Sequence, residues 1–198
     1  MATVIKRKGF GQVEPNHLSA QRTAQIYAQL PAADAIEILE NGQFVKYDYA
    51  NGEVNYTGVG EWMLVFNEVK LYDDWRESYK DFAMIKSNYT PGSDTITTPG
   101  SDTITHGGLG PFKGQMTPRV FKTNVGDIYT TNCIGGANTS GTAEYAGISV
   151  EEGNLLKVGA DGYLTTGGDI DADSMVWQVV KVYTLADSQP AVKIMRVK

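Results

Sequence analysis

The sequence predicts a mainly β protein, either a β-barrel or a β-sandwich, with an extended N-terminal arm and one or two short helices. Asn-Gly pairs at 41–42 and 51–52 are flanked by alternating apolar and polar residues, which is the strongest short-range hairpin signal. Residues 119–198 contain many short alternating segments separated by turn residues, as barrels and sandwiches do. Eleven tyrosines against six phenylalanines suit strands with one wet face.

A chain of 198 residues is long enough for one compact domain with a smaller appendage. We expect residues 1–31 to form an N-terminal arm with a short helix, and residues 32–198 to form the β-rich domain. Ser19 is a suitable N-cap for a helix between His17 and Pro31, and proline ends such a helix. The helix carries a thin apolar stripe that would dock on the domain or on a partner, made by Leu18, Ile26, Tyr27 and Leu30.

Residues 35–57 read as a three-stranded meander, with one turn at Asn41-Gly42 and the other at Asn51-Gly52. The run WMLVF that follows Glu61 is uniformly apolar, which favours a strand covered on both faces. Residues 71–85 are ambiguous. Asp74 and Glu77 resemble a capping box and favour a short helix, while a strand through 79–85 is the alternative.

The octapeptide TPGSDTIT occurs twice in succession, at 90–97 and 98–105, within a segment rich in glycine and proline at 87–118. A surface loop tolerates such a duplication, because each doubling of loop length costs only about 0.6 kcal/mol of closure entropy. Each copy can make a Pro-Gly-Ser-Asp turn and a Thr-Ile-Thr strand. We therefore expect a small projecting ribbon in which one repeat pairs beside the other.

The C-terminal part predicts several more strands joined by short turns. Turn residues occur at 124–127, 153–154, 161–162 and 167–168, and residues 186–190 join the final two strands as a hairpin. In the longest of these strands, strict alternation assigns side chains to two faces. One face would carry Val176, Val180 and Val182, and the other Trp177, Val179 and Tyr183.

Charge and composition argue against several classes of protein. The net charge of −6 and the pI of about 4.9 argue against a protein that coats nucleic acid, which needs a basic stripe. No stretch approaches 18 apolar residues, so we expect no membrane contact, and residues 1–10 do not resemble a signal peptide. Cys133 is the single cysteine and is expected to be a small core residue.

A search for catalytic and metal-binding patterns gives no candidate. His17 and His106 are the two histidines of the sequence and show no paired-ligand spacing, so we expect no zinc site, and no nucleophile elbow occurs. The run DIDAD at 169–173 begins like a calcium loop, but Ser174 and Val180 stand where an EF-hand needs glycine and glutamate. We therefore expect no enzyme, no cofactor and no metal. A glycan hydrolase is the remaining enzymatic alternative, with carboxylates drawn from Glu37, Asp48, Glu53 and Glu61.

Several stretches together resemble virion structural proteins of tailed bacteriophages: NHLSAQRTAQIYAQLP from Asn16, ENGQFVKYDYANGEVNYTGVGEWMLVFNEVKLYDDWRESY from Glu40, LLKVGADGYLTT from Leu155 and VWQVVKVYTLADSQPAVKIMRV from Val176. The resemblance implies an auxiliary head protein that decorates the capsid, with the major capsid protein and neighbouring copies as partners. It implies a place in the virion, on the phage head, after assembly in the host cytoplasm. The tandem octapeptide departs from this pattern.

A carbohydrate- or receptor-binding module of a phage particle is the alternative to a decoration protein. In that case the loops at 87–118 and 135–141 would recognise a cell surface, with Tyr89 and Phe112 as contact residues. Exposed tyrosines on the strands could also stack on sugars, and we name Tyr47, Tyr49, Tyr56 and Tyr72 as candidates.

Overall fold

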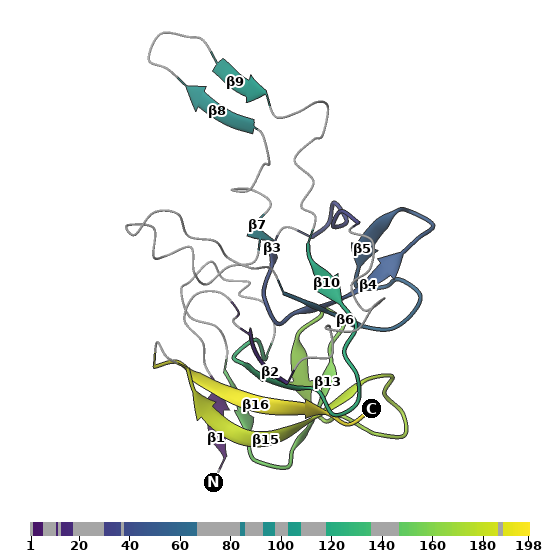
Figure 1. Cartoon of the computed structure of the whole chain (residues 1–198), viewed down its shortest axis with the longest axis vertical. Helices are drawn as coiled ribbons and strands as arrows, with labels where there is room; N and C mark the ends of the chain where they lie inside the picture. Colours follow the sequence, from purple (N-terminus) through teal and green to yellow (C-terminus); the bar gives the residue numbers. More distant parts are fainter. Residues whose placement is uncertain are drawn as a thin grey trace.

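A computed structural model describes residues 2–5, 11, 13–17, 30–36, 38–66, 84–85, 93–97, 103–107, 118–135, 147–185 and 188–198 (Figure 1). These residues form the strands β1–β16 and contain no helix, so the mainly β prediction is confirmed for them. The strand orders are open at both ends, and no sheet in the described part closes into a barrel.

The largest sheet has six strands in the order β14-β13-β15-β16-β11-β2, and every neighbouring pair is antiparallel. Its C-terminal hairpin, β15 and β16, is its longest pair, and this antiparallel pairing confirms the hairpin predicted across 186–190. The strands are β2 (Val13–His17), β11 (Ile128–Thr131), β13 (Leu155–Val158), β14 (Leu164–Thr166), β15 (Val176–Thr184) and β16 (Pro190–Arg196).

A second sheet has four strands in the order β10-β6-β4-β5. Its strands are β4 (Phe44–Asp48), β5 (Glu53–Asn55), β6 (Met63–Val65) and β10 (Val120–Phe121). Three further pairs stand as two-stranded sheets: β1 (Thr3–Ile5) with β12 (Ile148–Val150), β3 (Ile38–Leu39) with β7 (Met84–Ile85), and β8 (Ser93–Thr97) with β9 (Thr103–Gly107).

The main core lies between the four-stranded and six-stranded sheets. Phe44 of β4 meets Trp177 of β15 with ring centroids 5.7 Å apart, and Tyr129 of β11 meets the same indole at 5.7 Å. Leu64 of β6 and Ile194 of β16 belong to the same buried cluster. Side chains of two different sheets thus pack against each other here, as they do between the two layers of a β-sandwich.

A second core covers the opposite face of the four-stranded sheet. Val45 and Val65 point to this face, because successive side chains of a strand alternate, and both are fully buried. The cover is the segment 30–39, which adds Ala32 and Leu39 to the cluster. The Val54 N–H donates to the Pro31 carbonyl at 2.8 Å, which fixes this segment along β5. Strand β6 is therefore buried on both faces, as its apolar sequence predicted.

One half of the predicted meander is confirmed and the other half is wrong. Strands β4 and β5 form a hairpin around Asn51-Gly52. Strand β3 pairs with β7 and not with β4, whose other neighbour is β6. Residues 42–43 instead bond to the end of β6, because the Gly42 N–H donates to Val65 O and the Val65 N–H donates to Gln43 O, both at 2.9 Å.

The strict alternation predicted for β15 holds only in its first half. Trp177 and Val179 lie in the main core, as expected. The register against β16 then shifts between Val179 and Lys181, which indicates a β-bulge. Beyond the bulge, Val182 pairs with Val192 on the core side and Tyr183 pairs with Ala191 on the other side. The face assignments of Val182 and Tyr183 are therefore reversed relative to the prediction.

Several expectations fall partly outside the described residues. Strands β1 and β2, both from the expected arm, pair with β12 and β11 of the domain. Of the predicted helix from His17 to Pro31, the residues 18–29 lie outside the described part. For the ambiguous segment 71–85, only Met84–Ile85 is described, and it is the strand β7.

The ribbon predicted from the tandem repeat is confirmed at the level of the backbone. Strands β8 and β9 pair antiparallel, and the two Thr-Ile-Thr triplets lie opposite one another. Figure 1 places this hairpin at one end of the long axis of the molecule, with β15, β16 and both chain termini toward the other end.

Candidate functional site

Of the four residues expected to form the apolar contact stripe, Leu30 is the one that lies in the described part of the chain. Leu30 is half-buried and packs against the second core, so at least part of its surface serves the domain itself. The other three residues of the stripe lie outside the described part of the chain. Their role as a contact surface stays a prediction.

A buried polar network surrounds Glu40, which is only 1% exposed. Its Oε1 atom accepts a hydrogen bond from the Gly11 N–H at 2.6 Å, and its Oε2 atom accepts one from the Tyr163 hydroxyl. Next to it, the Gln43 side chain accepts from the Glu40 N–H at 3.0 Å and donates to the Tyr56 hydroxyl at 2.7 Å. The network joins the N-terminal segment, β4, β5 and the β13–β14 hairpin.

The turn between β13 and β14 is docked closely onto this network. Gln43 Nε2 also donates to Asp161 O at 2.7 Å, and the Phe44 N–H donates to Gly162 O at 2.8 Å. Gly162 has a φ of +79°, and a Cβ there would lie 2.2 Å from the Phe44 carbonyl oxygen, so this position requires glycine. Burial, helped by the Asp161 carboxylate, raises the pKa of Tyr56 well above its usual range. The Tyr56 hydroxyl therefore remains neutral within the network at physiological pH.

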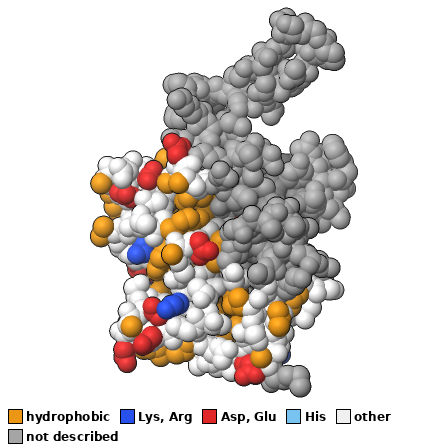
Figure 2. All heavy atoms as spheres, turned by 180° about the vertical axis from the view of Figure 1, so that it is seen from behind, with side chains coloured by type: hydrophobic (Ala, Val, Ile, Leu, Met, Phe, Trp, Pro, Cys, Tyr) orange, Lys and Arg blue, Asp and Glu red, His pale blue; other side chains and the backbone are white. Residues whose placement is uncertain are grey.

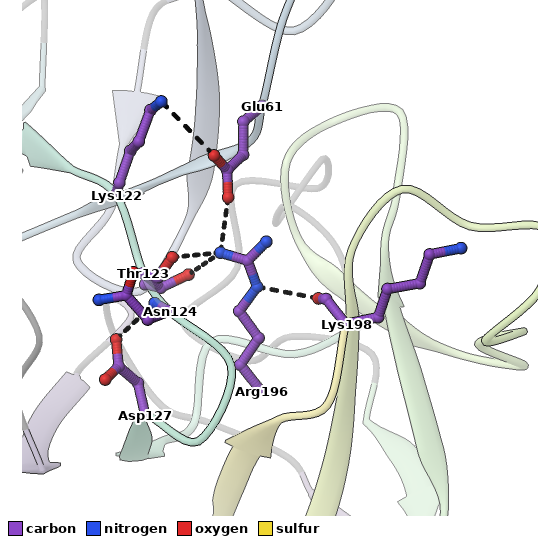
Figure 3. Close-up of polar contacts among 7 residues, drawn as sticks. All are labelled: Glu61, Lys122, Thr123, Asn124, Asp127, Arg196 and Lys198. Carbon is purple, nitrogen blue, oxygen red and sulfur yellow. Dashed lines mark hydrogen bonds and ion pairs between the residues drawn. The ribbon is translucent and has the colours of Figure 1, made fainter.

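A second polar cluster is centred on Arg196 near the end of β16 (Figure 3). The Arg196 Nη1 atom lies 2.6 Å from Glu61 Oε1 and donates to the Thr123 hydroxyl at 3.0 Å and to the Thr123 carbonyl. Its Nε atom donates to the Lys198 carbonyl at 2.8 Å. Lys122 approaches the other oxygen of Glu61 at 3.7 Å and is more exposed. We call this set of contacts the Arg196 clamp.

The Arg196 clamp holds the C-terminal strand to the loop between β10 and β11. The Gly126 N–H donates to Arg196 O at 2.8 Å, and the Arg196 N–H donates to Asp127 O at 2.9 Å. Asp127 also accepts from the Asn124 N–H at 2.7 Å, which closes the loop. Glu61, one of the four carboxylates considered for glycan hydrolysis, is thus engaged in an ion pair with a buried cation.

The acidic run at 169–173 is a turn whose carboxylates bond to its own backbone. Asp169 accepts from the Asp171 N–H at 2.8 Å, and Asp173 accepts from the Asp169 N–H at 2.7 Å. Lys157 and Lys198 supply nearby positive charge, the latter by donating to Ile170 O at 2.6 Å. Within the described residues, no group of three or more His, Cys, Asp or Glu side chains is arranged to hold a metal ion.

Among the described residues, three exposed apolar side chains lie on strands at the end of the molecule that carries β1, β15 and β16, while four others lie in turns: Tyr49, Val59, Val125 and Ile170. Val4 of β1 is 56% exposed, Val180 at the bulge of β15 is 43% exposed, and Tyr183 is 39% exposed. The Lys193 ammonium lies 5.6 Å from the centroid of the Tyr183 ring. Strand β1 lies beside β16. We call Val4, Val180, Tyr183 and the neighbouring Lys181 and Lys193 the base surface.

The β4–β5 turn carries a second exposed aromatic group. Tyr49 is 68% exposed, and its ring lies 5.3 Å from that of Tyr47. Beside it, Asp48 accepts hydrogen bonds from the Asn51 side chain at 2.9 Å and the Asn55 side chain at 3.2 Å, and the Asn51 bonds are the main cause of its lowered pKa.

The remaining tyrosines named from the sequence differ from Tyr49. Tyr47 is buried and Tyr56 is half-buried, so the expected exposure of the ring is wrong for Tyr47 and holds only in part for Tyr56. Tyr72 lies outside the described part.

On the face that Figure 2 shows, hydrophobic side chains are scattered among acidic and a few basic ones.

Sequence reasoning missed the central residues of both polar clusters. Glu40 and Gln43 flank the Asn-Gly pair that was assigned to a hairpin, and Arg196 lies in an alternating strand. A signal for Arg196 does exist, since a long charged side chain at a core-facing register position requires a partner. Nothing in the local pattern identifies Glu40.

Among the described residues, no helix is both long and apolar enough to cross a membrane. The chain matches no protein-family model, no curated protein and no solved structure.

Proposed function

We propose that this protein is a structural component of a tailed-phage virion that binds the major capsid protein and decorates or stabilises the head. It acts there without catalysis, as part of a particle assembled in the host cytoplasm. The supporting observation is that the two ends of the molecule differ. Exposed apolar side chains lie on strands at one end, and the β8–β9 hairpin lies at the other end of the long axis (Figure 1).

The base surface is the part of the chain that we assign to the capsid. Its apolar side chains gain about 25 cal/mol for each Å² that they bury against a partner. Lys181 and Lys193 add positive charge to a chain whose net charge is −6, and so favour an acidic strip on the capsid surface. If neighbouring copies on the capsid lattice are linked, each further contact forms at a high effective concentration. A weak single contact is then sufficient for stable attachment.

The apolar stripe predicted on the N-terminal segment would add a second contact with the capsid. A deletion of residues 1–30 is a poor test of it, because this deletion also removes Ile5 and Val13 from the main core. Substitution of Leu18, Ile26 and Tyr27 by serine leaves β1 and β2 in place. We expect this triple variant to bind more weakly while its thermal unfolding midpoint stays close to that of the parent.

The test of the capsid role is co-sedimentation of the purified chain with phage heads that lack it, with bound copies counted per head. We expect saturation at a number that matches the capsid lattice. The double variant Val180→Asp/Tyr183→Ala should lower the affinity at least tenfold, because it places charge and removes a ring in the base surface. Tyr49→Ala, at the β4–β5 turn, is the matched control and should bind normally.

Two results would overturn the capsid proposal. One is the absence of binding by a chain that is folded by circular dichroism. The other is binding that never saturates, since this indicates adsorption to the particle rather than occupation of defined sites.

A carbohydrate- or receptor-binding role is the second candidate, favoured by the β4–β5 turn. Sugar sites combine an exposed aromatic face with polar side chains that fix orientation, and the turn that carries the exposed Tyr49 also carries Asp48 and Asn51, whose side chains bond to each other. A glycan array tests this role. We expect any specific signal to be lost in Tyr49→Ala and retained in Tyr183→Ala. Tyr89→Ala and Phe112→Ala test the loop residues named from the sequence.

A further inference from the structure

The β8–β9 hairpin pairs two copies of one sequence with each other. In its register, Thr95 lies opposite Thr105, Ile96 opposite Ile104 and Thr97 opposite Thr103. Both triplets read Thr-Ile-Thr, and they occupy equivalent places in the two octapeptides. The hairpin is therefore an antiparallel pairing of this triplet with itself.

The triplet also reads the same in both directions. An antiparallel pairing of two identical palindromic strands has a two-fold axis through the central residue, here the isoleucine. Strand β8 of one molecule can therefore pair with strand β8 of another molecule, with Ile96 opposite Ile96 and Thr95 opposite Thr97. This arrangement repeats the residue pairs that the hairpin already makes within one chain.

Within the described part of the chain, no further strand pairs with the outer edges of this hairpin. Among the described residues, β8 has β9 as its single neighbour and β9 has β8. The unpaired N–H and C=O groups of an edge strand are a template for a further strand. An isolated two-stranded hairpin is marginally stable in water, whereas a ribbon of more strands is more stable.

We propose that two copies of this protein join through their β8 edges, which pair antiparallel about a two-fold axis at Ile96 and form a four-stranded ribbon. The contact is isologous, so it closes as a dimer and does not propagate. It concerns the hairpin alone and does not depend on the proposed capsid role. On a particle, it would link neighbouring copies at the end remote from the base surface.

Strand β8 is a better edge than β9 for this contact. Centred on Ile96, the five residues 94–98 read DTITT, of which four are β-branched and therefore favour strands. Centred on Ile104, the residues 102–106 read DTITH and are followed by two glycines, which disfavour strand pairing.

The register can be tested by disulfide formation in the full chain. In Ile96→Cys, the two introduced cysteines face each other across the axis, with Cα atoms about 4.5–5.5 Å apart, which suits a disulfide. In the control Asp94→Cys, the two thiols are displaced by four residues, about 13 Å along the strands. The native Cys133 is buried, so it contributes little background. We expect Ile96→Cys to form a covalent dimer at least tenfold faster than Asp94→Cys under mild oxidation.

Ile104→Cys tests the opposite edge of the hairpin in the same assay. Dimerisation of Ile104→Cys in place of Ile96→Cys would overturn the assignment to β8. Equal rates for Ile96→Cys and Asp94→Cys would overturn the pairing altogether, because random collision does not distinguish two positions on one strand.

A charge exchange provides a second and independent measurement of association. Thr95→Lys/Thr97→Lys places like charges opposite each other across the axis, and so does Thr95→Glu/Thr97→Glu. Each variant alone should be monomeric by light scattering at concentrations where the parent chain dimerises. An equimolar mixture should recover the dimer, because every pair across the axis then joins lysine to glutamate. Failure of the mixture to recover it, or a parent chain that stays monomeric, would refute the contact.

Discussion

The two cores on opposite faces of the four-stranded sheet differ in what they hold together. On one face, Phe44 packs with Trp177 and Tyr129 between two sheets built from distant parts of the chain. On the other face, Val45 packs under the short segment 30–39. The side chains that this segment adds to the second core include the two small ones of Ala32 and Ala33. Adjacent residues of one strand, Phe44 and Val45, thus serve different layers.

This difference predicts where the molecule opens first. The main core joins two sheets, so its loss separates the sandwich. The second core is closed by a short segment, which can lift while the two sheets stay packed. Segments with little buried apolar surface open at lower free energy than core strands do. We therefore expect amide exchange to be faster at Ala33, which donates to Val54 O, than at Val179 in the main core.

The largest expected effect comes from truncation of the central indole. Trp177 is fully buried and contacts aromatic rings from both sheets. Trp177→Ala should lower the free energy of unfolding by about 3–5 kcal/mol, since it leaves a large cavity. Urea denaturation measures this, with Trp177→Phe as a milder control. A loss of under about 1 kcal/mol would show that the two sheets are not held by this cluster.

A matched pair of leucines compares the two cores directly. Leu64 lies in the main core and Leu39 in the second core, and both are buried. Leucine-to-alanine changes in cores cost about 2–5 kcal/mol, depending on how far the site can collapse. We expect the loss of unfolding free energy to lie in the upper half of this range for Leu64→Ala and at its lower end for Leu39→Ala. The reverse order in urea denaturation would show that the second core is the more rigid one.

The Arg196 clamp should contribute less to stability than the main core does, and its two cations should differ. Arg196→Met leaves the buried Thr123 carbonyl and the Glu61 carboxylate without this partner. It should therefore destabilise by about 2–3 kcal/mol, below the range for fully buried pairs because Glu61 is partly exposed. Lys122→Met removes the longer and more exposed contact with the same carboxylate, and should change stability by less than about 0.5 kcal/mol. Chemical denaturation of both variants tests the difference.

The smallest expected effect concerns Tyr56 and alkaline pH. Because its pKa is raised in the folded protein, the contribution of this group is fully present below the unfolded tyrosine pKa of about 10 and is lost as the pH rises above that value. The unfolding free energy should therefore fall more steeply above pH 10 in the parent than in Tyr56→Phe. At neutral pH, Tyr56→Phe should cost about 1 kcal/mol for the lost bond with Gln43.

Local signals in the sequence predicted local structure. The Asn51-Gly52 hairpin, the doubly buried strand β6, the buried Cys133 and the pairing of the two octapeptides are all present. Each depends on turn chemistry, alternation or repetition within a few residues, which a sequence displays directly.

Features that depend on distant contacts could not be predicted. The Asn41-Gly42 pair looks like a hairpin, but Gly42 is packed against Cys133 and Thr131, where a Cβ would lie 2.8 Å from each. The bulge at Val180 reverses the faces of β15, and no periodicity signals it. The Glu40 network brings together residues more than a hundred positions apart in the sequence. Layer order and buried polar partners arise only when the sheets assemble.

The arrangement of the last strand has a mechanical consequence. Strand β16 is bonded on both sides, to β15 and β11, and its end is fastened by Arg196. A force that pulls the C-terminus along β16 loads these hydrogen bonds together in shear. A force that separates β8 from β9 at their open end, where Ser93 pairs with Gly107, instead breaks one pair of residues at a time. Under mechanical stress, the hairpin should therefore yield long before the C-terminal strand is extracted.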